Sequence, residues 1–577
     1  MSDRLLSLVT VLAAVFFITA AGAHAAEISK HTGPSDALSI CGVVTDIHNK
    51  PVKDVILSVF VNGKKVETPD EIATSGQGTY MEEVFLPLGT LPGAKVEIAA
   101  DKPNYKASDK VAFGEILKEK NNANGNNYYF AQHDFTMARE VTPAFWIATV
   151  VLVVVYALIA FELLHRTLAA LLGAALILTI SYTAGTFNSD YTILTFEEAM
   201  HAVDMNVILL LMAMMIIVGV LKKTGVFQWM AYKSYQLAKG NIFVLAAILM
   251  TVSAVTSAFL DNVTTMLLMI PVTIEIALTL KVNPITLMLP EAFASNVGGT
   301  ATLIGDPPNI MIGSYAKLSF VDFVKELTEV NIIILAISIV YFIFWYKKDY
   351  LKAQVGNVSE MIAHLREEYK ITNKKLLIQG GAILGITIFM FTIHGALHME
   401  PSVAALIGAA LLMVISRVDI VEMLEKEVEW PTLIFFMMLF IVVAGAEESG
   451  LIQVIADWVK EMSKGSLVAA ILMVLWVSAF ASAIIDNIPF TATMLPIVAY
   501  LNTAIPGAES GILWWSLALG ACLGGNGTMI GASANVVTVG MAERAGYPIS
   551  FMAYVKAAFL PMVISIIIAS GWLLLTM

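Results

Sequence analysis

The chain has 577 residues, of which 58% are hydrophobic and only 14% are charged, and its mean hydropathy is +0.77. This composition is typical of a polytopic membrane protein and excludes an ordinary soluble domain. The net charge of −12 provides no basic surface, so a nucleic-acid partner is not expected. Cys41 and Cys522 are far apart in the sequence and predict neither a disulfide nor a metal framework.

The N-terminal segment 1–26 contains an apolar run, residues 4–23, that ends at Ala23-His24-Ala25-Ala26. The Ala-x-Ala pattern is typical of a signal-peptide cleavage site. The run is also long enough to remain as a first membrane helix. Both interpretations place the following segment outside the cytoplasm.

Residues 27–142 are polar and carry alternating β-branched runs, such as residues 55–61, which are followed by Asn62-Gly63. This pattern predicts strands and turns, and therefore a small extracytoplasmic β-sandwich domain. The stretch 42–61 resembles small extracellular β-sandwich modules of the carboxypeptidase-regulatory type. We expect a structural or assembly role for this domain, because no residue in it supports capture of a substrate.

From Pro143 onward the sequence predicts membrane helices in two repeats, 143–346 and 376–577, joined by a charged cytoplasmic linker at 347–375. The helices expected in the first repeat are 143–162, 167–184, 205–221, 225–240, 241–258, 263–280, 285–316 and 330–346. Those expected in the second repeat are 376–395, 401–417, 430–448, 449–464, 465–482, 487–504, 512–540 and 553–577. The amphipathic segments, expected at the membrane interface, are 225–240 and 449–464; the helices broken at glycines are 285–316 and 512–540.

Two motifs occur in both repeats at nearly the same spacing. The sequence Ser257-Ala-Phe-Leu-Asp261-Asn262 returns 225 residues later as Ser482-Ala-Ile-Ile-Asp486-Asn487. A glycine-rich break at 298–309 returns 226 residues later at 524–535. Two different motifs that keep almost one offset indicate an internal duplication. Interrupted hydrophobic segments at matching places in two halves predict a transporter binding site.

Positive charge predicts the orientation of the helices, because cytoplasmic loops carry an excess of Lys and Arg. The residues expected in the cytoplasm are Arg166, Lys222, Lys223, Lys347, Lys348, Lys374, Lys375 and Arg417. With the β-sandwich domain outside, all of them fall inside if the two Asp-Asn motifs form re-entrant hairpins, the first entering from the cytoplasm and the second from outside. The two halves then run in opposite directions, as an inverted repeat. His394 and His398 are then expected at the surface near an external loop.

The polar groups in the duplicated motifs predict ion binding. Asp and Asn cost about 2–3 kcal/mol or more at the centre of a membrane helix, so their presence in apolar sequence indicates a function. Carboxamide and hydroxyl oxygens suit a hard cation such as sodium, helix N-termini suit an anion, and a buried aspartate can carry a proton. Asp261 and Asp486 are therefore candidate coupling-ion or proton sites, although each could instead cap the helix that follows it. Asn262 and Asn487 are the candidate sodium ligands.

Other polar residues of the two motifs complete the candidate site. Thr264, Thr265 and Thr491 could also bond their own helix backbone. Asp306 would add charge to one half only, because Ala532 stands at the matching position. The candidate substrate- and ion-binding residues are Asp261, Asn262, Thr264, Thr265, Gly299, Thr300, Asp306, Asn309, Asp486, Asn487, Thr491, Asn526, Thr528 and Asn535. No catalytic, nucleotide-binding or metal motif occurs, so neither enzyme activity nor a cofactor beyond a coupling sodium ion or proton is expected.

These motifs resemble those of the ion transporter superfamily and, within it, of the melanosomal P protein family. The resemblance rests on residues 257–265, 305–309, 486–494 and 524–535, and it extends over residues 143–577. The segment after the first apolar run is also similar to the lumenal loop of that family. Arsenite-efflux pumps and sodium/proton antiporters look like more distant relatives.

The resemblance implies a homodimer with a fixed scaffold and a mobile transport domain that carries both hairpins and moves by an elevator mechanism. The dicarboxylate/sodium symporters of the superfamily carry Ser-Asn-Thr at each hairpin tip, where they bind sodium and a substrate carboxylate. Here the matching residues are Asp261-Asn262-Val263 and Asp486-Asn487-Ile488. The asparagine is kept, the serine has become aspartate and the threonine is lost. Two added carboxylates would repel a dianion, which favours cation or proton coupling.

The sequence therefore predicts an all-α polytopic membrane protein, with an inverted repeat of two re-entrant hairpins and two broken helices, plus the exported β-sandwich domain. The expected function is secondary active transport of a small ion or anionic solute across the cell's inner membrane, coupled to sodium or protons. Two alternatives stay open: a channel-like anion conductance, and a membrane-anchored receptor that uses the β domain.

Overall fold

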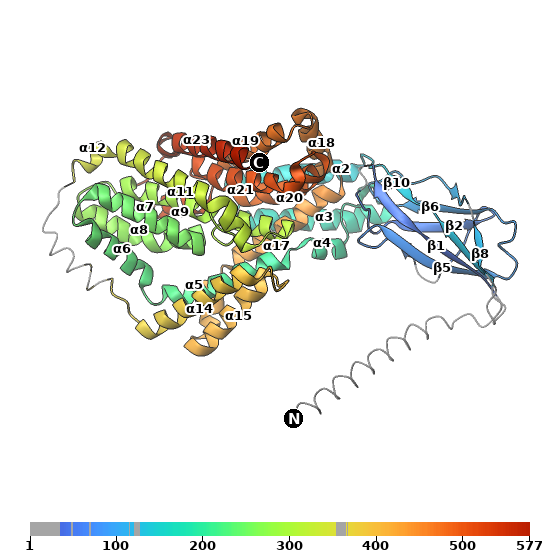
Figure 1. Ribbon diagram of the computed structural model, residues 1–577, viewed down its shortest axis with the longest axis horizontal. Helices are drawn as coiled ribbons and strands as arrows, with labels where there is room; N and C mark the ends of the chain where they lie inside the picture. Colours follow the sequence, from blue (N-terminus) through green and yellow to red (C-terminus); the bar gives the residue numbers. More distant parts are fainter. Residues whose placement is uncertain are drawn as a thin grey trace, which may run out of the picture. The chain divides into compact units, whose positions relative to one another are not determined.

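The computed structural model describes residues 35–577, except 48–49, 69–70, 115, 120–126, 354–364, 366 and 368. The predicted signal peptide or first helix at 1–26 lies outside the described residues and stays a prediction. The chain divides into two compact units, one ending at Val141 and the other beginning at Thr142 (Figure 1).

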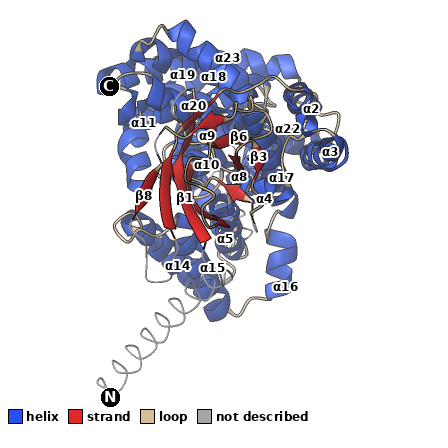
Figure 2. Cartoon of the chain, turned by 90° about the vertical axis from the view of Figure 1, so that its right-hand side faces the viewer, coloured by secondary structure: helices blue, strands red, loops and turns tan. Residues whose placement is uncertain are grey.

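The first unit consists of two five-stranded sheets that share one hydrophobic core; its strands are the red arrows in Figure 2. The strands of one sheet are β1 (Ser35–Asp46), β5 (Thr79–Pro87), β8 (Leu117–Glu119), β9 (Asn127–Gln132) and β10 (Phe135–Met137). Those of the other are β2 (Ile56–Val61), β3 (Lys64–Lys65), β4 (Ile72–Ala73), β6 (Val96–Asp101) and β7 (Val111–Ala112). The strand orders are β10-β1-β9-β8, with β5 paired to β1, and β3-β2-β6-β7, with β4 paired to β2.

The apolar run that predicts a strand at 55–61 forms β2 in the second sheet. Burial alternates along it, with Leu57, Val59 and Val61 in the shared core, as expected for a strand with one buried face. Asn62 and Gly63 follow with φ of 50° and 82°, and they turn the chain into β3.

The second unit is helical, and among its described residues ten helices are long and apolar enough to cross a membrane. The chain is therefore an integral membrane protein. The helices of the first half are α2 (Pro143–Ala160), α3 (Arg166–Phe187), α4 (Phe196–Ala202), α5 (Met205–Lys222), α6 (Val226–Ala238), α7 (Ile242–Phe259), α8 (Asn262–Thr279), α9 (Ile285–Thr300), α10 (Pro307–Ala316), α11 (Phe320–Trp345) and α12 (Lys347–Tyr350).

The second half follows a closely similar order. Its helices are α14 (Lys374–Ile393), α15 (Pro401–Ser416), α16 (Ile420–Glu422), α17 (Trp430–Glu448), α18 (Leu451–Ser463), α19 (Leu467–Ile484), α20 (Asn487–Ala504), α21 (Ile512–Gly524), α22 (Ser533–Arg544) and α23 (Phe551–Thr576). The two helices expected to break at glycines are each divided, into α9 with α10 and into α21 with α22.

Two expectations about the ends of helices are wrong. The helix predicted to begin at residue 330 begins at Phe320, because Ser319 and Asp322 form a capping box at its start. His394, expected at the surface, is 6% exposed. Its Nδ1 lies 2.9 Å from the carbonyl oxygen of Met399, and its Nε2 accepts the backbone N–H of Phe320 at 3.3 Å. The ring is buried because it satisfies backbone groups of two neighbouring helix ends.

The helix pairs α7–α8 and α19–α20 are each interrupted by two non-helical residues at the acidic motif. We call residues 260–261 the first junction and residues 485–486 the second junction. Asp261 and Asp486 are the N-caps of α8 and α20. Their carboxylates accept the N–H groups left free at the helix start, so the same local interaction separates the two helices in both halves.

Glycines let the helix before each junction pack closely on the helix that carries the glycine-rich break. A Cβ on Gly298 of α9 would lie 2.0–2.5 Å from backbone atoms of Ala254 of α7. A Cβ on Gly524 of α21 would lie 2.4–2.8 Å from backbone atoms of Ala479 of α19. Side chains do not approach backbone this closely, so only glycine permits these two helix contacts, which are of the kind that small residues provide in membrane proteins.

Replacing Gly298 with Ala should therefore force α7 away from α9 and destabilise the protein by about 1–3 kcal/mol, the usual cost of overpacking. The matched control is Gly385→Ala in α14, where a Cβ meets nothing within 4 Å. That change should raise stability by about 0.5–1 kcal/mol, because alanine is the better helix former. Thermal unfolding of the detergent-solubilised full chain measures both, and equal shifts would contradict close packing at Gly298.

Candidate functional site

A cavity of about 50 Å³ lies where the two junctions meet the two helix breaks. Its lining includes the first residues of α3, α8, α10, α20 and α22, together with Glu429 and Thr432 at the start of α17, so six helices begin at or beside it. Each helix N-terminus carries a partial positive charge and unpaired N–H groups. The cavity is therefore built from positive helix ends, and its character depends on the side chains placed against them.

Four of these six helix N-termini are preceded by a carboxylate. The N-caps of α8, α10, α17 and α20 are Asp261, Asp306, Glu429 and Asp486, respectively. The N-cap of α22 is Ala532, which brings no charge. Acidic N-caps therefore offset four of the six helix ends, whereas α3 and α22 have no acidic N-cap of their own.

Asp261 and Asp486 act as caps of the helices that follow them. The Asp261 carboxylate accepts the backbone N–H groups of Val263 at 2.8 Å and Thr264 at 3.1 Å, and also the Thr264 hydroxyl. The Asp486 carboxylate accepts the N–H of Ile488 at 3.0 Å. The carboxylate oxygens of both residues are thus already partly occupied by their own helices.

Asp306 has a different environment, although it is also an N-cap. Its side chain makes no capping hydrogen bond, and the residue is 1% exposed. The Nδ2 of Asn487 lies 3.4 Å and 3.3 Å from its two oxygens. This contact joins the first break to the second junction. Asp306 is therefore a buried carboxylate that makes no bond to its own helix, and burial makes its charge depend on a cation or a proton.

Four asparagines at and behind the cavity wall connect the two halves. The Nδ2 of Asn262 donates to the Oδ1 of Asn296 at 3.0 Å. The Nδ2 of Asn296 in turn donates to the Oδ1 atoms of Asn526 at 2.9 Å and Asn535 at 3.0 Å. All four residues are at most 2% exposed. A buried network of this kind ties the first junction to the second break and favours their movement as one body.

Asn309 and Asn535 hold the backbone of the two helix breaks. The Nδ2 of Asn309 donates to three carbonyl oxygens within residues 299–302, at 2.9–3.4 Å. The Nδ2 of Asn535 donates to two carbonyl oxygens within residues 525–528, at 2.9 and 3.0 Å. Carbonyls freed by a broken helix must find partners inside a membrane, and these two asparagines supply them in both halves.

Arg166, the first residue of α3, extends its guanidinium to the start of α22 and the second junction. It lies 3.5 Å from a carboxylate oxygen of Asp486, and it donates to the hydroxyls of Ser533 at 2.7 Å and Thr432 at 3.2 Å. The guanidinium also lies over the ring of Phe435, 5.4 Å from its centroid. Asp486 thus occupies a place between Arg166 and the α22 N-terminus that suits a carboxylate.

A wider vestibule of about 570 Å³ adjoins the inner cavity. Arg166, Val263, Glu429 and Ser533 line both spaces, so they form the boundary between them. Asp486 lines the vestibule only. A volume of this size matches pockets that hold small organic ligands.

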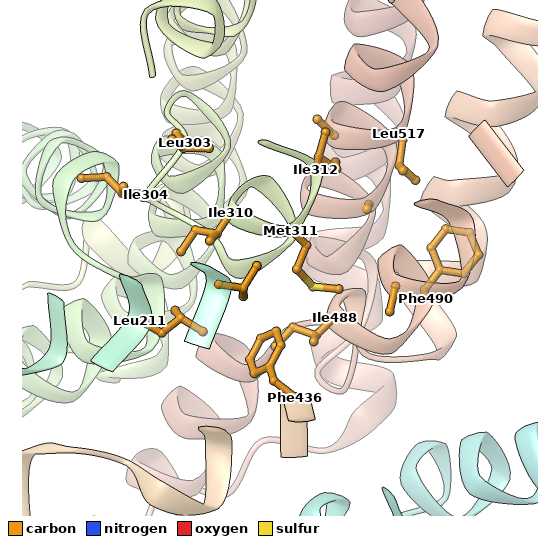
Figure 3. Packing of buried hydrophobic residues seen from close by; sticks show 14 of the residues in the cluster. Leu211, Leu303, Ile304, Ile310, Met311, Ile312, Phe436, Ile488, Phe490 and Leu517 are labelled. Atoms are coloured by element: carbon orange, nitrogen blue, oxygen red, sulfur yellow. The ribbon is translucent and has the colours of Figure 1, made fainter. Parts of the chain in front are cut away.

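The opposite wall of the inner cavity is apolar. Leu211 of α5, Ile304 of the first break, Ile310 of α10 and Ile488 of α20 line it, and all four belong to one buried cluster (Figure 3). An apolar wall excludes water and strengthens the electrostatic interactions on the polar side.

Comparison with known proteins places the chain in a family. Residues 156–520, which include both junctions, match the family described as citrate transporter (CitMHS). The chain belongs to the citrate transporter family. An uncharacterized transporter of Mycobacterium bovis is 40% identical over 430 residues, which cover 74% of this chain and 97% of that protein. The P protein of Homo sapiens is 35% identical over 503 residues, which cover 74% of this chain and 59% of the P protein.

These findings confirm the resemblance to the ion transporter superfamily and the P protein that the duplicated motifs predict. They also show that this citrate transporter family member is related to transporters rather than to enzymes. The relatives named as uncharacterized transporters match over nearly their whole length, and the P protein over part of its length.

The structure of this family member divides the fourteen predicted site residues into three groups. The five that line the inner cavity are Asp261, Asn262, Thr264, Asp306 and Asn487. Asp486 lines the vestibule. The eight that lie behind the cavity wall are Thr265, Gly299, Thr300, Asn309, Thr491, Asn526, Thr528 and Asn535. Six of these eight, all except Thr265 and Thr491, lie in the two glycine-rich breaks.

The threonines behind the wall differ in their contacts. The hydroxyls of Thr265 and Thr300 donate to carbonyl oxygens one turn earlier in their helices, at 3.0 and 2.7 Å. The Thr528 hydroxyl donates to the carbonyl of Ala483, beside the second junction. Thr491 is fully buried, and its hydroxyl hydrogen-bonds no group in the described part of the chain.

Four residues of the site are missed by sequence reasoning. Asn296 and Ser533 lie beside or within the glycine-rich breaks, but neither is matched by an identical residue in the other repeat. Arg166 is expected in a cytoplasmic loop, and Glu429 carries no motif at all. Both reach the cavity only because α3 and α17 begin beside the second junction, which no local sequence pattern records.

Proposed function

We propose that this protein is a secondary active transporter that moves a small anionic solute, coupled to sodium ions or protons. The observation that carries the proposal is the meeting of six helix N-termini from both halves, with a buried carboxylate on one side and an arginine on the other. The two sides form adjoining half-sites of opposite charge. Coupled binding of a cation and an anion is the chemistry that such a pair supports.

The cation half-site consists of Asp306, Asn487, Asp261 and Asn262. A cavity of about 50 Å³ has room for a few waters or a dehydrated small ion, but not for an organic solute. Carboxylate and carboxamide oxygens are hard ligands that suit sodium, and Asp306 could alternatively take up a proton. Cation binding would neutralise Asp306, a buried carboxylate that makes no capping bond to its own helix.

The anion half-site consists of Arg166, Ser533 and the N-terminus of α22, which has no acidic N-cap of its own. A carboxylate of the solute would replace that of Asp486, which now occupies this place at 3.5 Å from the guanidinium and 3.1 Å from the Ser533 hydroxyl. The vestibule has room for the remainder of the solute. Citrate is the first solute to test, because the family description names it.

We further propose an elevator mechanism in a homodimer, with the β-sheet unit outside the inner membrane. The mobile body would comprise α7–α10 and α19–α22, which the asparagine network joins. Polar contacts that would have to break during movement include those of Tyr156 with Pro489 at 2.6 Å and of Asn206 with Ser314 at 2.9 Å. In the orientation predicted from positive charge, Arg166 faces the cytoplasm, so the vestibule would open inward.

Uptake of radiolabelled citrate into proteoliposomes of the full chain tests this proposal. We expect uptake to accelerate under an inward sodium gradient or under a pH gradient, and to saturate with citrate concentration. Currents that exceed carrier turnover and ignore both gradients would instead indicate a channel-like anion conductance. Absence of flux under every gradient would contradict transport of citrate and favour the receptor alternative.

A further inference from the structure

A second buried carboxylate lies in the first half, outside the cavity. Glu291 of α9 is fully buried, and its two oxygens lie 2.9 and 3.1 Å from the Thr273 hydroxyl of α8. Within the described residues no Lys, Arg or His forms an ion pair with it. Leaving a charge buried with one neutral partner costs several kcal/mol, so this arrangement favours the protonated, neutral carboxyl.

The second half shows that the fold does not require this polar pair. At the offsets of the duplicated motifs, Glu291 corresponds to Leu517 and Thr273 corresponds to Val498. Both Leu517 and Val498 are fully buried. The protein thus contains its own apolar version of the same helix contact. A glutamate at a position where the other half buries a leucine indicates a role other than structure.

The surroundings of Glu291 offer few groups that could share its charge. The titratable side chains on the elements packed against α9 are Glu275 on α8, Asp322, Lys325, Glu326, Glu329 and Tyr341 on α11, Cys522 on α21, and Glu543 and Arg544 on α22. Glu275 accepts the hydroxyl of Tyr369 instead. A charge on Glu291 would interact electrostatically with Tyr350 of α12. The Tyr350 hydroxyl, however, donates to the carbonyl of Thr286 at 2.7 Å.

The ligand that suits this pair is a proton rather than a metal ion. Glu291 and Thr273 offer two carboxylate oxygens and one hydroxyl, whereas hard cations take about six or more oxygens. A threonine hydroxyl can donate to a carboxylate or accept from a carboxyl, so the pair is hydrogen-bonded in both protonation states. That property is what a site that gains and loses a proton requires.

We propose that Glu291 and Thr273 form a proton-binding site, separate from the cavity and present in the first half only, that loads and releases one proton during transport. On release the O–H bond of the carboxyl breaks, the proton passes to water, and the carboxylate keeps the electron pair and the hydrogen bond from Thr273. The transport part of this inference rests on the proposed function, whereas proton binding does not.

Infrared spectroscopy of the purified full chain tests proton binding without any substrate. The carbonyl-stretch band of protonated carboxyls is followed from about pH 5 to about pH 9, the range that buried carboxyls reach. We expect a band at neutral pH that Glu291→Gln removes, also in an Asp306→Asn background, and that Thr273→Val shifts in frequency. The control Asp322→Asn, at the start of α11, should leave it unchanged. A neutral-pH band that persists undiminished in Glu291→Gln would overturn the proposal.

A double variant connects the site to transport. Thr273→Val with Glu291→Leu copies the second half, so it should fold as stably as the unmodified protein. We expect it to lose citrate uptake driven by a pH gradient in proteoliposomes. Full pH-driven uptake by this variant would overturn the transport role. If the unmodified protein shows no citrate uptake, the proposed function fails, while the infrared result still decides proton binding.

Discussion

Replacing Asp306 with Asn should abolish ion-coupled transport while the protein stays folded. Asn has nearly the same shape and its Oδ1 can still accept from Asn487, but it cannot neutralise a cation or take up a proton. We expect gradient-driven citrate uptake to fall roughly ten- to a hundredfold, as loss of about 1.4–2.7 kcal/mol of ion-binding free energy implies. Uptake into proteoliposomes under sodium and pH gradients measures the effect.

The matched control is Asp204→Asn at the start of α5. Asp204 also caps a helix, accepting the N–H of Asn206 at 3.0 Å, but it does not line the cavity. Asn caps a helix as well as Asp does, so this variant should keep normal uptake. Equal uptake by both variants would show that Asp306 has no special role in coupling.

Replacing Arg166 with Gln should weaken binding of the anionic solute. Charge-assisted hydrogen bonds contribute about 1.5–3 kcal/mol, so the citrate concentration that gives half-maximal uptake should rise roughly ten- to a hundredfold. Asp486→Asn should act in the opposite direction. It keeps the cap of α20 but removes the carboxylate that now occupies the guanidinium, so citrate should bind more tightly.

The two variants also test whether the ion pair is structural. The side chains of Arg166 and Asp486 are 25% and 11% exposed, so the pair is partly screened by solvent. In a double-mutant cycle on thermal stability we expect an interaction energy of about 0.5–3 kcal/mol. Weaker citrate binding in both single variants would contradict displacement of Asp486 by the solute and leave the pair a purely structural contact.

The regularity of the duplicated motifs explains how much of this architecture the sequence predicts. An aspartate that caps a helix acts through the next few residues, so Asp261 and Asp486 mark the junctions by local chemistry alone. Spacing between motifs likewise predicts the helix breaks. The different roles of the carboxylates, by contrast, do not follow from their neighbours in the sequence. Asp306 is distinguished by its burial and by its contact with Asn487, which lies 181 positions away in the chain.

The residues that sequence reasoning missed come from outside the motifs or differ between the halves. Arg166 reaches the cavity because α3 packs on α17. No sequence pattern predicts this tertiary contact. Asn296 corresponds to Cys522 in the second half, so a search for matching polar residues passes over it. The differences between the repeats therefore include site residues that a comparison of the two motifs does not find.

The measurement that tests the central claim most directly is ion-dependent thermal stability of the purified full chain, with sodium, lithium, potassium and pH varied. An ion that binds only the folded state stabilises it by about 2.7 kcal/mol at a hundredfold excess over its dissociation constant. We expect a shift with sodium or with pH that is lost in Asp306→Asn and kept in Asp204→Asn. No response to any ion or pH, or an equal response in Asp306→Asn, would contradict a coupling-ion site between the two halves.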